Sequence, residues 1–271
     1  MDEDQTPGTA ASAPRTAAFF DLDKTIIATS SATAFSRPFL AEGLLTRRAV
    51  VRSAYAQLLY LVGGADEHQS ERLRAQLSRM VTGWDVAKVS AIVEETLHES
   101  IDPSVYLEAV ALIDEHHAAG RDVVVVSASG AEVVEPIAAA LGADHVIATR
   151  MTVLDGRYTG GIDFYAYGEN KAIAIAALAA DQGYDLSASY GYSDSITDAP
   201  MLGVVGHAFA VNPDRALRRL AAENGWGALT FSRPVPLFTR PPAHVLTSGA
   251  VVLVVAAVVV TWVLVRRRRR A

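Results

Sequence analysis

The chain contains no cysteine among its 271 residues. This absence excludes disulfides, thiolate metal sites and cysteine nucleophiles, although a cysteine-free protein can fold in either redox environment. Lysine is also scarce, because Lys24, Lys88 and Lys171 are the only three, and arginine supplies the remaining positive charge. A lysine at a chemically suggestive position therefore carries more weight here than it would in a lysine-rich chain.

Positive charge is in short supply outside the last few residues. The formal net charge is −6, and five of the 24 basic residues are the arginines at 266–270. The other 19 basic residues and the 30 acidic residues give the body of the chain a formal charge of −11. Nucleic-acid binding depends on neutralising phosphates with basic side chains. We therefore expect no nucleic-acid partner.

The two ends of the chain differ from its body. Residues 1–15 are acidic, small and proline-containing, which is typical of a disordered tail, and they lack the basic and apolar regions of a signal peptide. Residues 245–265 carry no charge and would make about 31 Å of helix, against a membrane hydrocarbon core of about 30 Å. We predict a transmembrane helix there, between a Pro-rich linker at 233–244 and a basic tail at 266–271. A single-pass C-terminal membrane anchor, with the main domain in the cytoplasm, is the expected localisation.

Between residues 16 and 232, short apolar runs alternate with helical patterns. Strands alternating with helices predict a parallel sheet with helices on both faces, which is a doubly wound, Rossmann-like α/β fold. The apolar runs that we interpret as strands are TAAFFD, RDVVVVS, DHVIAT, the stretch from Ala188 to Tyr192, and HAFAV.

Local signals refine this pattern. Asp102-Pro103 is expected to open a helix that Gly120 ends, with His116 in its last turn, where a positive charge suits the helix dipole. Ser129-Gly130-Ala131-Glu132 has the spacing of a capping box for the next helix. Asp155-Gly156 predicts a hairpin turn within residues 150–162.

Residues 30–100 interrupt the alternation directly after the first strand. They show helical patterns without a convincing strand, and Gly43 and Gly83 stand where helices would end. Open α/β sheets bind ligands beyond the carboxyl ends of their strands. We therefore predict an inserted helical cap domain over that edge of the sheet.

Two aspartates follow the first strand in the stretch FFDLDKT. Side chains at positions i and i+2 of an extended segment point the same way, so Asp21 and Asp23 could present two carboxylates to one point. Like charges at such a distance are unfavourable unless a cation or a proton lies between them. The pair therefore indicates a site for positive charge.

Other polar side chains fall at the same edge of the predicted sheet. Ser127 ends the run VVVVS, and Lys171 begins the helix of GENKAIAIAALAA. Asp194 and Asp198 lie on either side of a turn in GYSDSITDAP. Since the carboxyl ends of parallel strands share one edge, these segments are expected to converge with Asp21 and Asp23.

These four segments, in this order and with a cap-sized insert after the first, resemble the haloacid dehalogenase (HAD) superfamily of phosphotransferases. Within it, they are similar to subfamily IB, the phosphoserine-phosphatase-like hydrolases with a helical cap. The resemblance covers about residues 16–232. It implies an enzyme that hydrolyses phosphomonoesters.

The resemblance also implies roles for the polar residues. Asp21 would attack phosphorus and form an aspartyl-phosphate, which splits one difficult step into two easier ones. Asp23 would protonate the leaving oxygen and then deprotonate the hydrolytic water. Ser127 and Lys171 would bind the phosphate oxygens that are not transferred.

A Mg²⁺ cofactor is implied as well. Its protein ligands would be Asp21, the backbone carbonyl of Asp23, and Asp194, with water and phosphate oxygens completing an octahedron. Asp198 is expected to orient Lys171 or a metal-bound water without itself touching the substrate.

The residues leave the substrate open. In phosphoserine phosphatases an acidic residue nine positions after the nucleophile commonly takes the ammonium group, and here that position is the neutral Ser30. The predicted membrane span would suit a phosphorylated lipid or lysolipid, whereas a small phosphorylated metabolite needs no tether. Phosphoserine is an alternative substrate. A non-catalytic, membrane-tethered phospho-accepting or scaffold domain is a further alternative, against which the complete set of four motifs argues.

Overall fold

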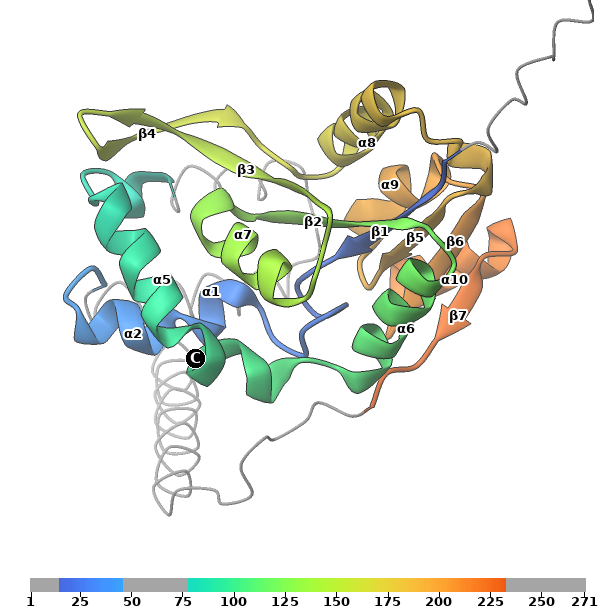
Figure 1. Cartoon of the computed structure of the whole chain (residues 1–271), viewed down its shortest axis with the longest axis horizontal. Coiled ribbons are helices and arrows are strands. Elements are labelled where there is room, and N and C mark those ends of the chain that lie inside the picture. Colours follow the sequence, from blue (N-terminus) through green and yellow to red (C-terminus); the bar gives the residue numbers. More distant parts are fainter. Residues whose placement is uncertain (1–14, 46–77, 233–271) are drawn as a thin grey trace, which may run out of the picture. The chain divides into compact units, whose positions relative to one another are not determined.

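A computed structural model describes residues 15–45 and 78–232 of the chain (Figure 1). The predicted linker at 233–244 and basic tail at 266–271 lie outside the described residues, as does the predicted N-terminal tail apart from Arg15. Part of the predicted cap, residues 46–77, also lies outside them.

The described residues form a seven-stranded sheet with the strand order β4-β3-β2-β1-β5-β6-β7. All neighbouring strands are parallel except β3 and β4, which pair antiparallel at one edge. The strand order reverses direction at the central strand β1. Open α/β sheets bind ligands beyond the carboxyl ends of the strands at such a reversal. The strands are β1 Ala17–Asp21, β2 Asp122–Gly130, β3 His145–Leu154, β4 Arg157–Phe164, β5 Tyr190–Ser193, β6 His207–Val211 and β7 Gly227–Leu229.

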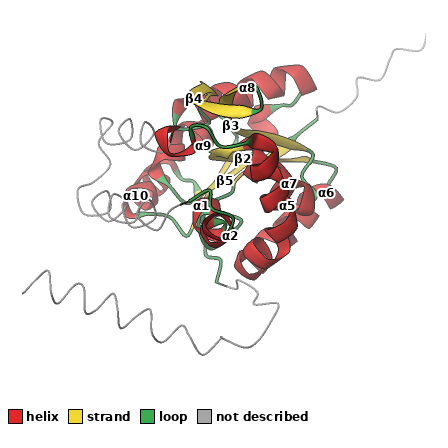
Figure 2. Cartoon of the chain, turned by 90° about the vertical axis from the view of Figure 1, so that its left-hand side faces the viewer, coloured by secondary structure: helices red, strands yellow, loops and turns green. Residues whose placement is uncertain are grey.

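Helices cover both faces of the sheet (Figure 2). Because side chains alternate along a strand, Phe20 packs into one hydrophobic cluster with α5, α6 and α7, and Phe19 packs into another with α8, α9 and α10. The predicted Rossmann-like α/β arrangement is therefore confirmed. The helices are α1 Ser31–Ala34, α2 Ser36–Ala41, α5 Val86–Ile101, α6 Leu107–Ala118, α7 Ala131–Ala140, α8 Glu169–Gln182, α9 Ala199–Gly203 and α10 Arg215–Asn224, with short 3₁₀ turns at η1 Asp102–Ser104, η2 Leu186–Ala188 and η3 Ile196–Asp198.

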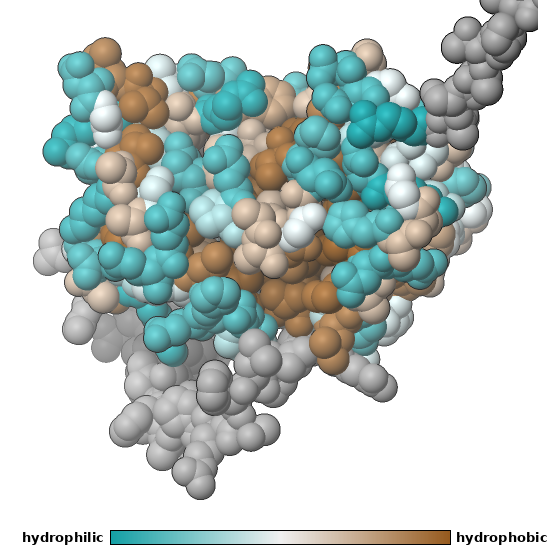
Figure 3. All heavy atoms as spheres, in the orientation of Figure 1, coloured by the Kyte–Doolittle hydropathy of each residue, from teal (hydrophilic) through white to brown (hydrophobic). Residues whose placement is uncertain are grey.

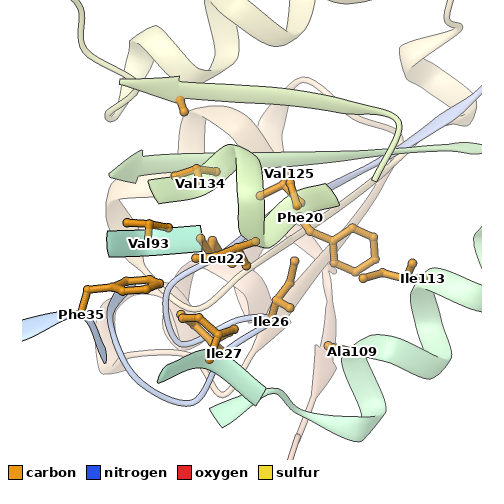
Figure 4. Close-up of a cluster of buried hydrophobic side chains, with 14 of the residues drawn as sticks. Phe20, Leu22, Ile26, Ile27, Phe35, Val93, Ala109, Ile113, Val125 and Val134 are labelled. Atoms are coloured by element: carbon orange, nitrogen blue, oxygen red, sulfur yellow. The ribbon is translucent and has the colours of Figure 1, made fainter. Parts of the chain in front are cut away.

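The described parts of the predicted cap are helical. Between β1 and β2 the chain forms α1, α2 and α5, which lie side by side (Figures 1 and 2). Phe35, which follows α1, points toward Val93 of α5 and toward Leu22 and Ile27 of the loop after β1 (Figure 4). Through this cluster, the start of the predicted cap packs against the residues that directly follow the strand carrying Asp21.

The hairpin predicted at Asp155-Gly156 is confirmed, and both residues have the positive φ that a tight two-residue turn requires. The hairpin is also bonded to the residues before α5. The Gly83 amide donates to the Tyr158 carbonyl at 2.8 Å, and the Tyr158 amide donates to the Trp84 carbonyl at 3.1 Å. Apolar side chains gather on the surface near this hairpin (Figure 3), where Leu154 is 65% exposed.

One prediction about the overall organisation is corrected. Among residues 15–45 and 78–232, no helix is long and apolar enough to span a membrane. The segment 245–265 lies outside these residues, so the predicted C-terminal transmembrane helix and the single-pass membrane localisation are not supported. Length and apolarity are needed for a span, but by themselves they do not place a segment in a bilayer.

Two local predictions are corrected too, and one strand was missed. Asp102 and Pro103 open the short η1 turn, and α6 begins only after Tyr106. The helix α7 is preceded by Gly130 without any side-chain cap, so the capping-box interpretation of Ser129 is wrong. The edge strand β7 was not predicted, because its sequence Gly-Ala-Leu is too short and too poor in β-branched residues to give a strand pattern.

His116 is buried between α6 and β5. Its Nδ1 lies 3.2 Å from an Arg121 nitrogen, and its Nε2 lies 2.9 Å from the Tyr192 hydroxyl. Because arginine can only donate, Nδ1 must accept, which leaves the ring proton on Nε2. Burial lowers the pKa of His116 to about 4, and the positive charge of Arg121 contributes to the shift. The prediction that His116 would carry a favourable positive charge at this helix end is therefore wrong.

The depressed pKa of His116 predicts acid sensitivity. A folded-state pKa below the unfolded value means that the unfolded chain binds the proton more readily, so stability falls as the pH drops from about 6.5 toward 4. In urea unfolding, His116→Gln should remove roughly 2 kcal/mol of the stability lost between about pH 7 and pH 5. His117→Gln, at a more exposed neighbouring position, is the matched control. Equal pH dependence of wild type and His116→Gln would contradict this prediction.

Candidate active site

Asp21, Ser127 and Asp194 meet at one edge of the sheet. Asp21 is the last residue of β1 and is in register with Val126 of β2, one residue before Ser127. Asp194 directly follows β5, the neighbour of β1 on its other side. The sheet therefore brings three of the predicted site residues together at the edge where the strand order reverses.

Lys171 lies between two aspartates. Its Nζ is 2.7 Å from Asp21 Oδ1 and 2.8 Å from Asp198 Oδ2, and its side chain is 2% exposed. The two carboxylates raise the pKa of Lys171 more than burial lowers it, so the ammonium keeps its charge. An ammonium has three protons, and these contacts use two of them. The third can be donated to a phosphate oxygen.

The backbone before α8 aims Lys171 into the site. Gly168 precedes the helix with φ 56° and ψ −127°, a conformation that residues with a Cβ rarely adopt. This glycine lets the chain turn sharply, so that the third residue of the helix reaches the sheet edge. Glycine at this position is therefore part of the site's architecture.

Asp198 contacts Lys171. In addition to that ion pair, its Oδ2 accepts a hydrogen bond from the Ser193 hydroxyl at 2.7 Å. The side chain makes no capping bond to α9, which begins directly after it. These contacts support the predicted role of Asp198 in orienting Lys171.

The negative charge at this edge exceeds the positive charge. Burial raises the pKa of Asp21 well above its usual value; Lys171 opposes the shift, and the carboxylates of Asp198, Asp194 and Asp23 add to it. An ionised Asp21 therefore needs a further cation, and a phosphate dianion would need one even more. This surplus of carboxylates fits a divalent cation.

Asp194 has the environment of a cation ligand. Among the described residues, no other residue donates a hydrogen bond to its carboxylate. Burial raises its pKa to about 6, although the positive charges of Lys24 and Lys171 oppose the shift. No group of three or more His, Cys, Asp or Glu side chains suited to a metal occurs in residues 15–45 and 78–232. The predicted Mg²⁺ set contains only two carboxylates and one backbone carbonyl, which suits an ion that commonly keeps several waters and binds substrate phosphate.

Asp23 is held by two serines that the sequence analysis did not select. Its Oδ1 accepts from the Ser31 amide at 2.8 Å, and its Oδ2 lies 3.3 Å from the Ser31 hydroxyl and 3.2 Å from the Ser129 hydroxyl. Burial raises the pKa of Asp23, and these hydrogen bonds oppose the shift. The available signal was the serine at both i and i+2 in the stretch SAS near the end of β2, which places both hydroxyls at the sheet edge.

Ser127 is buried at the end of the strand run that was predicted for it. Its Oγ accepts a hydrogen bond from the Ser129 amide at 3.1 Å. The hydroxyl proton is then available for an oxygen of a bound phosphate.

Thr149 joins two of these segments. Its buried hydroxyl donates to the Ala128 carbonyl at 2.7 Å and accepts from the Ala166 amide at 3.2 Å. Ala128 follows Ser127, and Ala166 lies in the loop that leads to Lys171. One side chain from β3 therefore ties together the two predicted phosphate-binding segments.

Replacing Thr149 by valine tests this tie. Valine keeps the shape but removes the side-chain partner of the buried Ala166 amide and of the partly buried Ala128 carbonyl. This should lower the free energy of unfolding by roughly 2–3 kcal/mol. Thr152→Val makes the same change on the same strand, where the hydroxyl bonds the exposed Asp163, and should cost less than about 1 kcal/mol. Denaturant unfolding of both variants measures the difference. Equal losses would contradict the role of Thr149.

Comparison with known proteins agrees with this arrangement. Residues 18–203 match the family model of haloacid dehalogenase-like hydrolases. The chain belongs to that family. The expected resemblance is thereby confirmed, and the relatives named as phosphatases confirm the expected phosphatase class.

The relatives of this HAD phosphatase include named phosphatases. A Mycobacterium tuberculosis (strain H37Rv) protein described as a probable phosphatase is 62% identical over 239 residues, covering 88% of this chain and 83% of the relative. A phosphoserine phosphatase of the same organism is 36% identical over 217 residues, covering 79% and 70%. A crystal structure of a Bordetella pertussis protein of unknown function has a TM-score of 0.70 and 30% identity, covering 80% of this chain and 99% of the other.

Proposed function

We propose that this HAD phosphatase hydrolyses a phosphorylated small metabolite in a Mg²⁺-dependent reaction that passes through an aspartyl-phosphate on Asp21. The observation that carries the proposal is the buried Asp21–Lys171–Asp198 cluster beside the carboxylate of Asp194. It combines a nucleophile, a fixed cation for phosphate and oxygen ligands for a metal in one place.

The chain's own groups can perform both halves of the reaction. Asp21 attacks phosphorus while the bond to the leaving oxygen breaks, and that oxygen takes the proton of Asp23. Asp23 then accepts a proton from the water that attacks the aspartyl-phosphate, which frees Asp21 and inorganic phosphate. Ser127 and Lys171 hold the other phosphate oxygens throughout.

Mg²⁺ would be held by Asp21, Asp194 and the carbonyl of Asp23. When bound, it would neutralise charge on the phosphoryl group and let Asp21 stay ionised. The carboxylate surplus around Asp21 supports this assignment.

Phosphoserine is the second candidate substrate, favoured by the relative named as a phosphoserine phosphatase. The residue at position 30, a neutral serine, argues against phosphoserine as the substrate. Its hydroxyl lies 2.7 Å from the Thr33 hydroxyl and caps α1, and it has no charge to pair with an ammonium group. We therefore favour a phosphomonoester without an ammonium at that place. The lipid alternative depended on the predicted membrane span and is not carried further.

The test is phosphate release by the full chain from 4-nitrophenyl phosphate and from a panel of phosphorylated sugars, alcohols and amino acids. We expect turnover in Mg²⁺, loss of turnover in excess chelator, and recovery when Mg²⁺ is added back. Undiminished turnover in chelator would contradict the metal requirement. Absence of release from every compound would contradict the proposed function, and phosphoserine as the best substrate would favour the second candidate.

A further inference from the structure

The two serines at Asp23 form one connected group. Ser31 Oγ and Ser129 Oγ lie 2.7 Å apart, and both lie within 3.3 Å of Asp23 Oδ2. The three residues come from distant parts of the chain, because Ser31 opens α1 and Ser129 lies near the end of β2. Only the folded chain brings the three oxygens together.

In the described part of the chain, neither hydroxyl caps the helix beside it. The helix α1 is capped by Ser30, whose hydroxyl accepts from the Thr33 amide at 3.2 Å. The helix α7 follows Gly130 and has no side-chain cap. Asp23 is thus the shared partner of the Ser31 and Ser129 hydroxyls.

The position of each serine is itself well determined. Ser31 is fully buried, and its amide holds the other carboxylate oxygen of Asp23 at 2.8 Å. Ser129 donates its own amide to Ser127 Oγ, so it links Asp23 to the predicted phosphate-binding serine. Phe35 anchors the short helix that begins with Ser31 in the core (Figure 4).

We propose that the hydroxyls of Ser31 and Ser129 act as a positioning pair that aims the carboxyl group of Asp23 at the leaving oxygen. This inference rests on the proposed function, in which Asp23 protonates that oxygen. The hydroxyl pair on one oxygen and the Ser31 amide on the other fix both the location and the rotation of the carboxyl group. General acid catalysis depends on such placement within hydrogen-bond distance of the reacting oxygen.

The positioning role predicts a dependence on the leaving group. A nitrophenolate is a weak base that departs with little help from an acid, whereas an unsubstituted phenolate gains more from protonation. The ratio kcat/KM reports steps up to the first phosphoryl transfer, so it isolates protonation of the leaving oxygen from the later attack of water.

The experiment compares 4-nitrophenyl phosphate and phenyl phosphate in Mg²⁺. The double variant Ser31→Ala/Ser129→Ala should lose roughly 100-fold in kcat/KM on phenyl phosphate and less than about 10-fold on the nitrophenyl ester. Each single variant should show a smaller effect, because the other hydroxyl still reaches Oδ2. Ser129→Thr, which keeps a hydroxyl, should restore most of the loss seen for Ser129→Ala.

Ser30→Ala is the matched control. It removes the cap of α1 without touching Asp23, and it should lower both kcat/KM values equally or not at all. Equal losses on the two esters for the double variant, or the same selective loss in Ser30→Ala, would overturn the positioning role alone. A wild type that is inactive on both esters would overturn the proposed function and this role with it.

Discussion

Replacing Asp21 by asparagine should reduce phosphate release by about 10⁴-fold or more, because the amide cannot attack phosphorus. The side chain keeps nearly the same volume, and its amide oxygen can still accept from the Lys171 ammonium 2.7 Å away. The change also removes a buried negative charge beside other carboxylates. We therefore expect the free energy of unfolding to stay within about 1 kcal/mol of wild type.

Two measurements check this expectation. Release of inorganic phosphate gives the activity, and mass spectrometry of acid-quenched wild type during turnover should find the phosphoryl group on the peptide that contains Asp21. Asp181→Asn, an exposed site on α8, is the matched substitution and should leave turnover unchanged. Retention of more than about 1% of wild-type activity by Asp21→Asn would rule out its role as nucleophile.

Replacing Lys171 by methionine should cost both stability and activity. The ammonium separates the carboxylates of Asp21 and Asp198, and methionine would leave two buried negative charges without their positively charged partner. Breaking a buried ion pair from one side typically costs about 3–5 kcal/mol. Activity should fall by about 10³-fold, because a fixed positive charge on the phosphate is lost as well.

A second substitution separates the two effects. Lys171→Met/Asp198→Asn removes one of the unpaired charges, so it should recover part of the stability while remaining inactive. Lys88→Met, at an exposed lysine bonded to the Glu42 carbonyl, is the control and should change stability by less than about 1 kcal/mol. A fully stable Lys171→Met protein would show that the buried cluster contributes little to the fold.

Much of the architecture could be predicted from residue patterns. Apolar runs such as VVVV within β2 can only be buried, and their alternation with helical patterns leaves few arrangements other than a parallel sheet covered on both faces. Because the carboxyl ends of parallel strands lie at the same edge of a sheet, motif residues at those ends come together there. The sequence by itself therefore determined the fold class, the family resemblance and the placement of Asp21, Ser127, Lys171 and Asp194.

Patterns failed where a local signal had two meanings. Ser129 has the spacing of a helix cap, yet its hydroxyl bonds Asp23, which is 106 residues away in the chain. The segment 245–265 has the length and apolarity of a membrane span, but the described structure offers no spanning helix to support it. In both cases the composition allowed an interpretation that depends on surroundings the local sequence does not specify.

Only the tertiary structure decided the partners within the site. Lys171 pairs with Asp21 across 150 residues and with Asp198 across 27, and the serine pair on Asp23 joins the first residue of α1 to the end of β2. Such contacts depend on how strand register and helix packing place side chains to within an ångström. The periodicity of apolar residues in the sequence does not predict positions that closely. The charge balance at Asp21 and the orientation of Asp23 are therefore known only from the folded chain. The residue types available for the chemistry could already be identified from the four motifs.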